Sequence, residues 1–401
     1  MSLFSPVEMA PRDPILGLNE AFNADPREEK VNLGVGIYYD DNGKVPLMRA
    51  VQAAEEARVA EHAPRVYLPI EGLAPYDLAV QKLLLGTDSP LIGSGRVITA
   101  QSIGGTGALK LGADFLRRLA NKSLVAISDP SWENHRSLFE AAGYDVVTYP
   151  YYDSETNGLN LEGMLDGIAA LPAGSVVLLH ACCHNPTGVD LQADDWHKVI
   201  DVIRKHQHVP FLDIAYQGFG DNLEEDALAV RLFAESGLPC LVASSFSKSF
   251  SLYGERVGAL TLITETADEG ARVMSQIKRV IRTNYSNPPT HGAKVVAAVL
   301  TTPELYTMWE QELAEMRIRI KQMRKLLAEK LQAAGVKQDV SFIEQQRGMF
   351  SYSGLNREQV ERLAKESAIY AVGSGRICVA ALNGNNIDTV ANAMAKVMLE
   401  S

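Results

Sequence analysis

Residues 175–215 read SVVLLHACCHNPTGVDLQADDWHKVIDVIRKHQHVPFLDIA, and this stretch decides the fold. An apolar run of strand length opens it at residues 175–180, and a second one follows at residues 209–213. The residues between them have the amphipathic pattern of a helix. A strand, a helix and a further strand in this order are typical of two parallel strands joined by a crossover helix.

The same alternation extends from about residue 95 to residue 265. Because crossover helices cover both faces of a parallel sheet, we predict an α/β domain with a doubly wound, mostly parallel sheet and a helix-like segment after each strand. In such sheets, ligands bind beyond the carboxyl ends of the strands. The predicted strands are Arg96–Gln101, Ser123–Ser128, Asp145–Tyr149, Ser175–His180, Val209–Asp213, Cys240–Ser244 and Gly258–Ile263.

The rest of the sequence predicts a second, smaller domain. Residues 304–334 contain neither glycine nor proline and indicate one long helix that links the two domains. Residues 335–401 have the pattern of a short α+β unit, with strands in QRGMFSYSGL and SGRICVAALN, and we expect residues 12–45 to join this unit. The predicted organisation is an N-terminal arm (1–11), a first part of the small domain (12–45), a large domain (46–315) and a second part of the small domain (316–401).

Composition narrows the class of protein. Hydrophobic residues make up 46% of the 401 residues and charged residues 22%, proportions typical of a soluble globular chain. The formal net charge is -11 and no dense Lys/Arg run occurs, so nucleic acid is an unfavourable partner. Neither a signal peptide nor an apolar stretch of membrane-spanning length is recognisable, and we therefore expect a cytoplasmic protein without membrane contact.

The cysteines indicate reduced thiols and no metal site. Only four occur, and Cys182 and Cys183 are adjacent in a strand-like run, where a mutual disulfide would be strained. His180 and His184 stand beside them, but four such residues would alternate across a strand rather than converge on one ion.

The segment SSFSKSFSLYGERVG, residues 244–258, places one lysine among serines directly after a predicted strand. Most lysines are surface charges, but the hydroxyl neighbours of Lys248 and the nearby Arg256 suit a phosphate ester better than bulk solvent. A neighbouring cation also lowers the pKa of an amine, as a nucleophilic lysine requires. We therefore predict that Lys248 binds a carbonyl cofactor as a Schiff base.

Polar residues follow two further predicted strands. In FLDIAYQGFG, residues 211–220, Asp213 ends the strand and Tyr216 follows three residues later. A turn-capping aspartate is the ordinary alternative, but beside such a lysine Asp213 can pair with a protonated pyridine nitrogen and Tyr216 can donate to a phenolate oxygen. Asn185 in HNPTG, residues 184–188, can donate to the same oxygen, or this segment can be a plain turn.

Two more post-strand segments suit the same cofactor. GGTGAL, residues 104–109, opens a helix, so the backbone N–H groups of Gly105 and Thr106 can receive a phosphate, although the spacing is that of neither a dinucleotide site nor a P-loop. In PSWENH, residues 130–135, Trp132 can stack on a flat ring or belong to the core. His135 can orient Asp213 or be purely structural.

Arg376 and Arg282 are candidate substrate-binding residues, because a planar guanidinium binds a carboxylate through two hydrogen bonds. Arg376 begins a strand in the predicted small domain, and Arg282 precedes NYSNPP in a proline-rich loop. A surface salt bridge is the alternative for each.

Ordered segments along nearly the whole chain resemble the fold-type I pyridoxal-phosphate aminotransferases, in the branch of aspartate and bacterial aromatic-amino-acid aminotransferases. Any one segment can arise by chance, whereas the ordered set is specific. The matching segments are RDPILGLNEAF, KVNLGVGIYY, YLPIEGL, GGTGALKLGADF, SDPSWENH, HACCHNPTG, FLDIAYQGF, SFSKSFSLYGERVG, RTNYSNPP, QRGMFSY and SGRICVA.

The resemblance implies pyridoxal 5'-phosphate as cofactor and a ping-pong amino-group exchange between amino acids and 2-keto acids such as 2-oxoglutarate, through pyridoxamine phosphate. It implies a homodimer with shared active sites, in which Tyr67 reaches the partner's phosphate and Arg282 meets the distal carboxylate of a dicarboxylic substrate across the interface. The catalytic residues that it implies are Lys248, Asp213 and Tyr216. The other cofactor-binding residues that it implies are Gly105, Thr106, Trp132, Asn185, Ser245, Ser247, Arg256 and Tyr67. The substrate-binding residues that it implies are Gly36, Trp132, Asn185, Arg376 and Arg282.

Comparison within this branch gives a mixed expectation for specificity. Residues Ile37, Tyr39, Val45 and Val66 are expected to make the pocket less polar than that of an aspartate-only enzyme, whereas Thr106 and Asn287 match the aspartate type. We expect an enzyme that accepts tyrosine, phenylalanine and aspartate, with an aspartate-preferring enzyme as the alternative.

Three other classes of protein are alternatives for this sequence. Another fold-type I enzyme, such as a lyase, would share the cofactor but would not exchange keto acids. An aminotransferase-like module of a transcription regulator would need an additional basic helix-turn-helix segment. A nicotinamide-dependent dehydrogenase would need a dinucleotide fingerprint.

Overall fold

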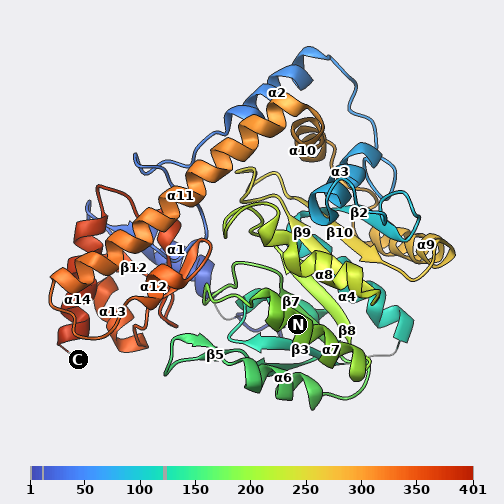
Figure 1. The fold of residues 1–401 in the computed structure, drawn as a ribbon. Coiled ribbons are helices and arrows are strands. Elements are labelled where there is room, and N and C mark those ends of the chain that lie inside the picture. Colours follow the sequence, from blue (N-terminus) through green and yellow to red (C-terminus); the bar gives the residue numbers. More distant parts are fainter. Residues whose placement is uncertain (1, 11–12, 121–123, 401) are drawn as a thin grey trace.

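A seven-stranded sheet with the strand order β2-β10-β9-β8-β7-β3-β4 forms the centre of the protein (Figure 1). The computed structural model describes residues 2–10, 13–120 and 124–400. Every predicted strand is present within one or two residues of its expected bounds, although Ser123, where one was expected to begin, lies outside the described residues. The strands are β2 (Val97–Ile103), β3 (Leu124–Asp129), β4 (Asp145–Pro150), β7 (Val176–His180), β8 (Val209–Ile214), β9 (Cys240–Ser245) and β10 (Val257–Ile263).

The sheet is parallel except at β10, which runs antiparallel to both of its neighbours, β2 and β9. The prediction of a helix-like segment after each strand is wrong at this one place. Between β9 and β10, residues 246–256 form turns instead of a helix, so the chain returns beside β9 in the opposite direction. The loop formed in this way carries Lys248.

Helices cover both faces of the sheet, because alternate strand residues point to opposite sides. Val176 and Leu178 of β7 pack in one apolar cluster with residues of α4, α5 and α9, whereas Val177 and Leu179 pack in a second cluster with α6, α7, α8 and α11. The helices are α1 (Pro14–Ala24), α2 (Arg49–Ala60), α3 (Ala74–Leu85), α4 (Gly104–Ala120), α5 (Glu133–Ala141), α6 (Leu161–Ala169), α7 (Ala193–Lys205), α8 (Leu228–Ser236), α9 (Ala267–Asn284), α10 (His291–Thr301), α11 (Pro303–Ala333), α12 (Phe342–Gln345), α13 (Arg357–Ser367) and α14 (Ile387–Leu399), with 3-10 turns at Glu225–Ala227 and Val379–Ala381.

The long helix predicted over residues 304–334 is α11. Pro303 stands in its first turn, where a missing N–H costs nothing. Figure 1 shows α11 running from the α2 and α10 end of the molecule to the C-terminal unit. No helix among the described residues is long and apolar enough to cross a membrane.

The C-terminal unit is built on short strand pairs. Strand β11 (Phe350–Tyr352) pairs antiparallel with β13 (Arg376–Cys378), and each lies in one of the two predicted strand segments. Strand β1 (Val31–Asn32) pairs parallel with β12 (Ile369–Tyr370), so an N-terminal segment lies against this unit. A small hairpin of β5 (Tyr152–Asp153) and β6 (Gly158–Leu159) belongs to neither pair, but Tyr152 contacts Tyr352 of β11 edge-on, with ring centres 5.1 Å apart.

The strand that opens the deciding stretch ends where it was predicted to end, and the backbone bends directly after it. Strand β7 ends at His180, and residues 181–183 form bends in which Cys183 adopts a left-handed backbone with φ of 51°. The expectation that the side chains of residues 180–184 alternate across a strand is therefore wrong.

Candidate active site

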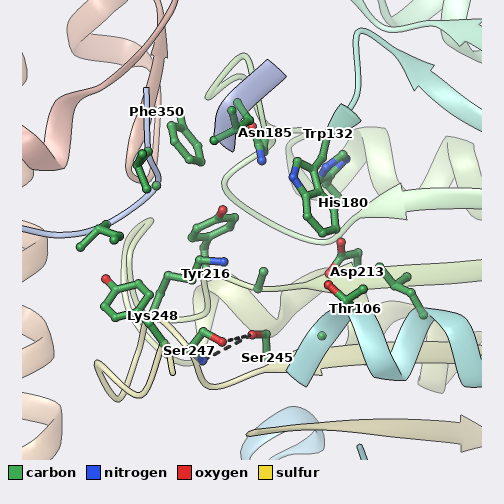
Figure 2. Close-up of a pocket in the computed structure, with 18 of the residues that line it drawn as sticks. Thr106, Trp132, His180, Asn185, Asp213, Tyr216, Ser245, Ser247, Lys248 and Phe350 are labelled. Atoms are coloured by element: carbon green, nitrogen blue, oxygen red, sulfur yellow. Dashed lines mark hydrogen bonds between the residues drawn. The ribbon is translucent and has the colours of Figure 1, made fainter. Parts of the chain in front are cut away.

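A cavity of about 420 Å³ lies beyond the carboxyl ends of β3, β7, β8 and β9, as expected for a doubly wound sheet (Figure 2). The N-terminus of α4 and strands β11 and β13 of the C-terminal unit close it from other sides. The predicted site residues that line it are Gly36, Gly105, Thr106, Trp132, Asn185, Asp213, Tyr216, Ser245, Ser247, Lys248, Arg256 and Arg376.

Lys248 extends from the loop after β9 into this cavity, with its Nζ 5.0 Å from the centre of the Tyr216 ring. Burial lowers the pKa of Lys248 to about 8, Asp213 opposes this shift, and the charges of Arg256 and Arg376 add to it. The sequence had suggested a neighbouring cation as the cause, but removal from water is the larger effect. A lowered amine pKa increases the fraction of the neutral, nucleophilic form.

Asp213 lies at the end of β8, buried against His135. Nε2 of His135 is 2.8 Å from Oδ2 of Asp213, and Nδ1 of His135 is 2.9 Å from the hydroxyl of Ser131. Burial alone would raise the pKa of Asp213, but the hydrogen bond from His135 and the positive charges nearby, including Lys248, lower it below its ordinary value. The carboxyl group is therefore ionised, and it can hold a cationic N–H inside the cavity.

A cradle for a phosphate lies at the other end of the cavity. Nη1 of Arg256 donates to the Ser247 hydroxyl at 3.2 Å, and the hydroxyl oxygens of Ser245 and Ser247 are 3.3 Å apart (Figure 2). The first turn of α4 faces them, and a Cβ added to Gly105 would lie 3.0 Å from the Cβ of Ser245. Glycine therefore lets the backbone N–H groups of the helix N-terminus approach the hydroxyls and the guanidinium, an arrangement that suits a dianion.

Arg376 presents a second cation from β13. Its side chain is buried, with Nη1 donating to Oδ1 of Asn185 at 3.0 Å and Nη2 donating to the Gly34 carbonyl at 2.7 Å. The guanidinium lies 4.3 Å from the centre of the Phe350 ring. Its Nε is buried without a hydrogen-bond partner among the described residues. A carboxylate in the cavity could satisfy such a guanidinium through two oxygens.

Gly36 is required where the N-terminal segment crosses this end of the cavity. A Cβ at Gly36 would lie 2.6 Å from Cζ of Phe350, which also packs edge-on against Tyr216. Trp132 enters from the start of α5 and contacts His135 edge-on, with ring centres 5.1 Å apart. These aromatic walls suit a flat ligand.

Sequence reasoning did not single out Phe350 or His180, which also line the cavity. Burial, followed by the charge of His135, lowers the pKa of His180 to about 3, so this ring is neutral. Its Nε2 is buried and has no hydrogen-bond partner among the described residues. The position of His180 at the end of a predicted strand was the signal that could have identified it.

Two predicted site residues lie outside this cavity. The side chain of Tyr67 is 91% exposed. Arg282 is also exposed, and it stands in the last turn of α9 rather than in a proline-rich loop, because the helix continues to Asn284. One chain alone does not bring either side chain to Lys248.

The residues expected to set specificity are also divided. Ile37 and Thr106 line the cavity. Asn287 donates to the Leu68 carbonyl at 3.1 Å instead. Tyr39, Val45 and Val66 do not line the cavity of their own chain. Tyr39 packs against the core, whereas Val45 and Val66 are exposed, the latter at 67%.

Comparisons with known proteins agree with these features. Residues 28–394 match the family described as "Aminotransferase class I and II". The aspartate aminotransferase of Pseudomonas aeruginosa is 67% identical over 99% of this chain and 100% of its own length. The aromatic-amino-acid aminotransferase of Escherichia coli is 50% identical, with the same coverage.

A comparison with solved structures also matches this chain to an aminotransferase. The crystal structure of the aromatic-amino-acid aminotransferase from Burkholderia pseudomallei, covalently bound to pyridoxal phosphate, has a TM-score of 0.97 and 66% sequence identity, and the match covers 99% of this chain and 100% of that chain.

Proposed function

Because the chain belongs to the class I and II aminotransferases, we propose that it transfers the amino group of aspartate and of aromatic amino acids to 2-oxoglutarate. Its cofactor is pyridoxal phosphate, and its substrates are amino acids and 2-keto acids. One observation carries the proposal. The amine of Lys248, the carboxylate of Asp213 and the guanidinium of Arg376 line one cavity, so they can act on a single amino acid.

The residues of the cavity fit each part of pyridoxal phosphate. We assign the phosphate to Ser245, Ser247, Arg256 and the N-terminus of α4, which form the cradle described above. A protonated pyridine nitrogen would be held by the ionised carboxylate of Asp213. We assign the cofactor ring to Trp132, and its phenolate oxygen to Asn185 and Tyr216.

When bound, the cofactor supplies a carbonyl for covalent attachment of amines and a ring that accepts the electron pair left at the substrate Cα. Lys248 is assigned two tasks, which are attachment of the resting cofactor and transfer of the proton at Cα. An amine with a pKa near 8 gives up a proton more readily than an ordinary lysine. Arg376 would hold the α-carboxylate and thereby orient the Cα–H bond.

Both acidic and aromatic side chains are proposed to enter the same cavity. The apolar side chains of Ile15, Ile37 and Leu109 line it and can bury an aromatic ring. The guanidinium for an acidic side chain would be Arg282, which lies outside the cavity of its own chain. We therefore propose a homodimer in which Arg282 and Tyr67 of each subunit complete the cavity of the other.

The cytoplasm is the proposed location, and it rests on the four buried cysteines, none of which is paired in a disulfide. The domain division at residues 12–45, 46–315 and 316–401 also remains our proposal. It rests on the pairing of β1 with β12.

An aspartate-preferring enzyme is the second candidate, favoured by Thr106 in the cavity and by the 67% identity to an aspartate aminotransferase. A panel of amino-acid donors with 2-oxoglutarate as acceptor tests both candidates. The proposal predicts stoichiometric glutamate formation with aspartate, tyrosine and phenylalanine. Product without glutamate would contradict amino-group transfer, and glutamate from aspartate alone would favour the second candidate.

A further inference from the structure

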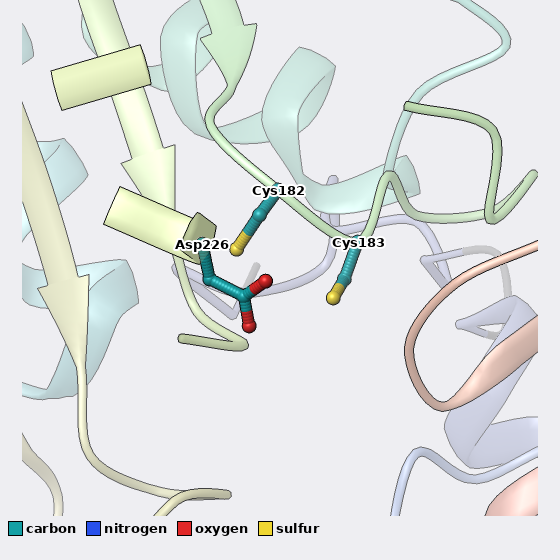
Figure 3. Close-up of side chains that lie close together, drawn as sticks. All are labelled: Cys182, Cys183 and Asp226. Atoms are coloured by element: carbon teal, nitrogen blue, oxygen red, sulfur yellow. The ribbon is translucent and has the colours of Figure 1, made fainter. Parts of the chain in front are cut away.

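We propose that Cys182, Cys183 and Asp226 form a binding site for one thiophilic divalent metal ion, such as Zn²⁺ or Cd²⁺, behind the wall of the cofactor cavity (Figure 3). The site is separate from the aminotransferase chemistry proposed above and uses none of its catalytic residues.

The ligand atoms of these three residues already lie close together. The two Sγ atoms and a carboxylate oxygen of Asp226 are all within 4.8 Å of one another. In a tetrahedral site, Zn–S bonds of about 2.3 Å and Zn–O bonds of about 2.1 Å place ligand atoms roughly 3.6–3.8 Å apart, about 1 Å closer than this limit. Small side-chain rotations therefore suffice to bring the three atoms onto one ion. Figure 3 shows both sulfur atoms on the same side of their segment as Asp226.

The backbone explains why two successive side chains converge. Strand β7 has ended, and Cys183 has a φ of 51°, which removes the alternation of a strand. The Asp190 carboxylate accepts hydrogen bonds from the backbone N–H groups of Cys183 at 2.7 Å and His184 at 2.8 Å, and these bonds hold the bend. Gly348 makes room opposite, because a Cβ there would lie 2.5 Å from the Cβ of Cys183.

The third ligand is held in place by the loop after β8. Oδ2 of Asp226 accepts from the N–H groups of Gly218 at 2.8 Å and Gly220 at 2.9 Å, and Oδ1 accepts from Asp221 at 2.9 Å. A carboxylate oxygen accepts two bonds, so these contacts leave one acceptor position on Oδ1. A Cβ at Gly220 would lie 2.4 Å from Oδ1, and glycine therefore keeps this side of the carboxylate accessible.

Space and charge also suit an ion. A cavity of about 170 Å³ borders Cys182 and Asp226 and reaches the partly exposed Asp221 and Arg347. Two thiolates, one carboxylate and one divalent ion leave a single negative charge. Arg324 is 1% exposed and interacts electrostatically with Cys183, so it can balance that charge. Thiolate ligands select soft ions over Mg²⁺ and Ca²⁺.

Binding has a defined proton balance. The hydrogen bond with Cys183 lowers the pKa of Cys182, but burial and the charges of nearby aspartates outweigh it and raise that pKa to about 11. The same hydrogen bond, together with burial, raises the pKa of Cys183 well above its ordinary value, so both cysteines are thiols in the free protein. Formation of two metal–sulfur bonds therefore releases two protons for each divalent ion bound, and no electron is transferred. Cys182 also lines the cofactor cavity, so an ion on its sulfur should alter the absorption spectrum of the bound cofactor.

The test is a titration of the pyridoxal-phosphate-loaded enzyme with Cd²⁺. Ultraviolet thiolate-to-cadmium absorption, proton release and binding heat are measured together. We expect one ion per chain, two protons per ion and a change in the cofactor spectrum. Cys183→Ser and Cys182→Ser should each weaken binding by at least about tenfold and reduce the thiolate absorption. Asp226→Asn should weaken binding while keeping that absorption.

The matched controls are Cys240→Ser and Cys378→Ser, which replace the other two buried cysteines. These variants should bind Cd²⁺ as the wild type does. Absence of thiolate absorption in the wild type, or its persistence in Cys183→Ser, would overturn the proposal. If Cys182→Ser fails to fold, as judged by circular dichroism, the Cys183→Ser result decides.

Discussion

Nε2 of His135 lies 2.8 Å from Oδ2 of Asp213, although the two residues are 78 positions apart in the chain. Because an ionised carboxylate only accepts hydrogen bonds, His135 donates from Nε2, while its Nδ1 lies 2.9 Å from the Ser131 hydroxyl. This orientation keeps the carboxylate ionised and aimed at the cavity. His135 is therefore a positioning residue for Asp213.

Replacement of the carboxylate tests its assigned role. Asp213→Asn should lower kcat by about 100-fold or more, because a neutral amide cannot stabilise a cationic ring nitrogen. A kcat within a few-fold of the wild-type value would contradict the assignment.

His135→Asn should have a smaller effect with a distinct pH signature. Loss of the hydrogen bond should raise the pKa of Asp213, so activity should fall at a higher pH than in the wild type as the solution is acidified. The measurement is the pH profile of kcat for both proteins. A uniform loss of activity with an unshifted acidic limb would indicate a purely structural role.

Lys248→Ala should abolish turnover but leave a folded protein that still binds pyridoxal phosphate. The contacts assigned to the phosphate and the ring come from other residues, so binding persists without a covalent bond. Both proteins are reduced with borohydride and then denatured. The cofactor should stay attached to the wild-type protein and should dissociate from the variant. Near wild-type transamination by Lys248→Ala would disprove the role of this lysine.

The lowered pKa of Lys248 predicts a pH dependence of stability in the cofactor-free protein. Between about 8 and the ordinary value of 10.5, the unfolded chain binds a proton that the folded chain does not. Stability should therefore rise with pH across this window, relative to a Lys248→Met variant. Thermal midpoints of the two proteins, measured from pH 7 to pH 11, should diverge in this sense. A constant difference would mean that this amine titrates normally.

The proposed shared sites predict complementation between inactive subunits. Lys248→Ala is mixed with a Tyr67→Ala and Arg282→Ala double variant, and the subunits are exchanged. Each heterodimer then regains one cavity with all three side chains. Activity toward aspartate should rise toward about a quarter of the wild-type value if subunits mix at random. No increase, despite verified exchange, would argue against shared sites.

The specificity proposal predicts comparable kcat/KM for aspartate and for tyrosine or phenylalanine. Burial of an aromatic ring yields roughly 25 cal/mol per Å², or a few kcal/mol, which is comparable to one charge-assisted contact. Arg282→Ala should therefore damage aspartate turnover selectively, by about tenfold or more. Rejection of aromatic donors by the wild type would favour the aspartate-preferring candidate.

Local pattern was sufficient for much of the site. The apolar runs located every strand of the central sheet, and the polar residues just after them, including Asp213 and Lys248, do line one cavity. The strands could be predicted because strand length and apolar content are local properties of the sequence. The site residues could be predicted because parallel strands bring their carboxyl ends, where ligands bind, to a single edge of the sheet.

Contacts between segments that are far apart in the chain were decided only by the tertiary structure. Strand β10 inserts antiparallel between β2 and β9, and Arg376 reaches Asn185 from 191 residues away. The convergence of Cys182 and Cys183 on Asp226 depends on a left-handed bend, and the exclusion of Arg282 from its own cavity depends on the direction of α9. Such contacts arise from non-local packing and backbone direction, which no short window of sequence encodes.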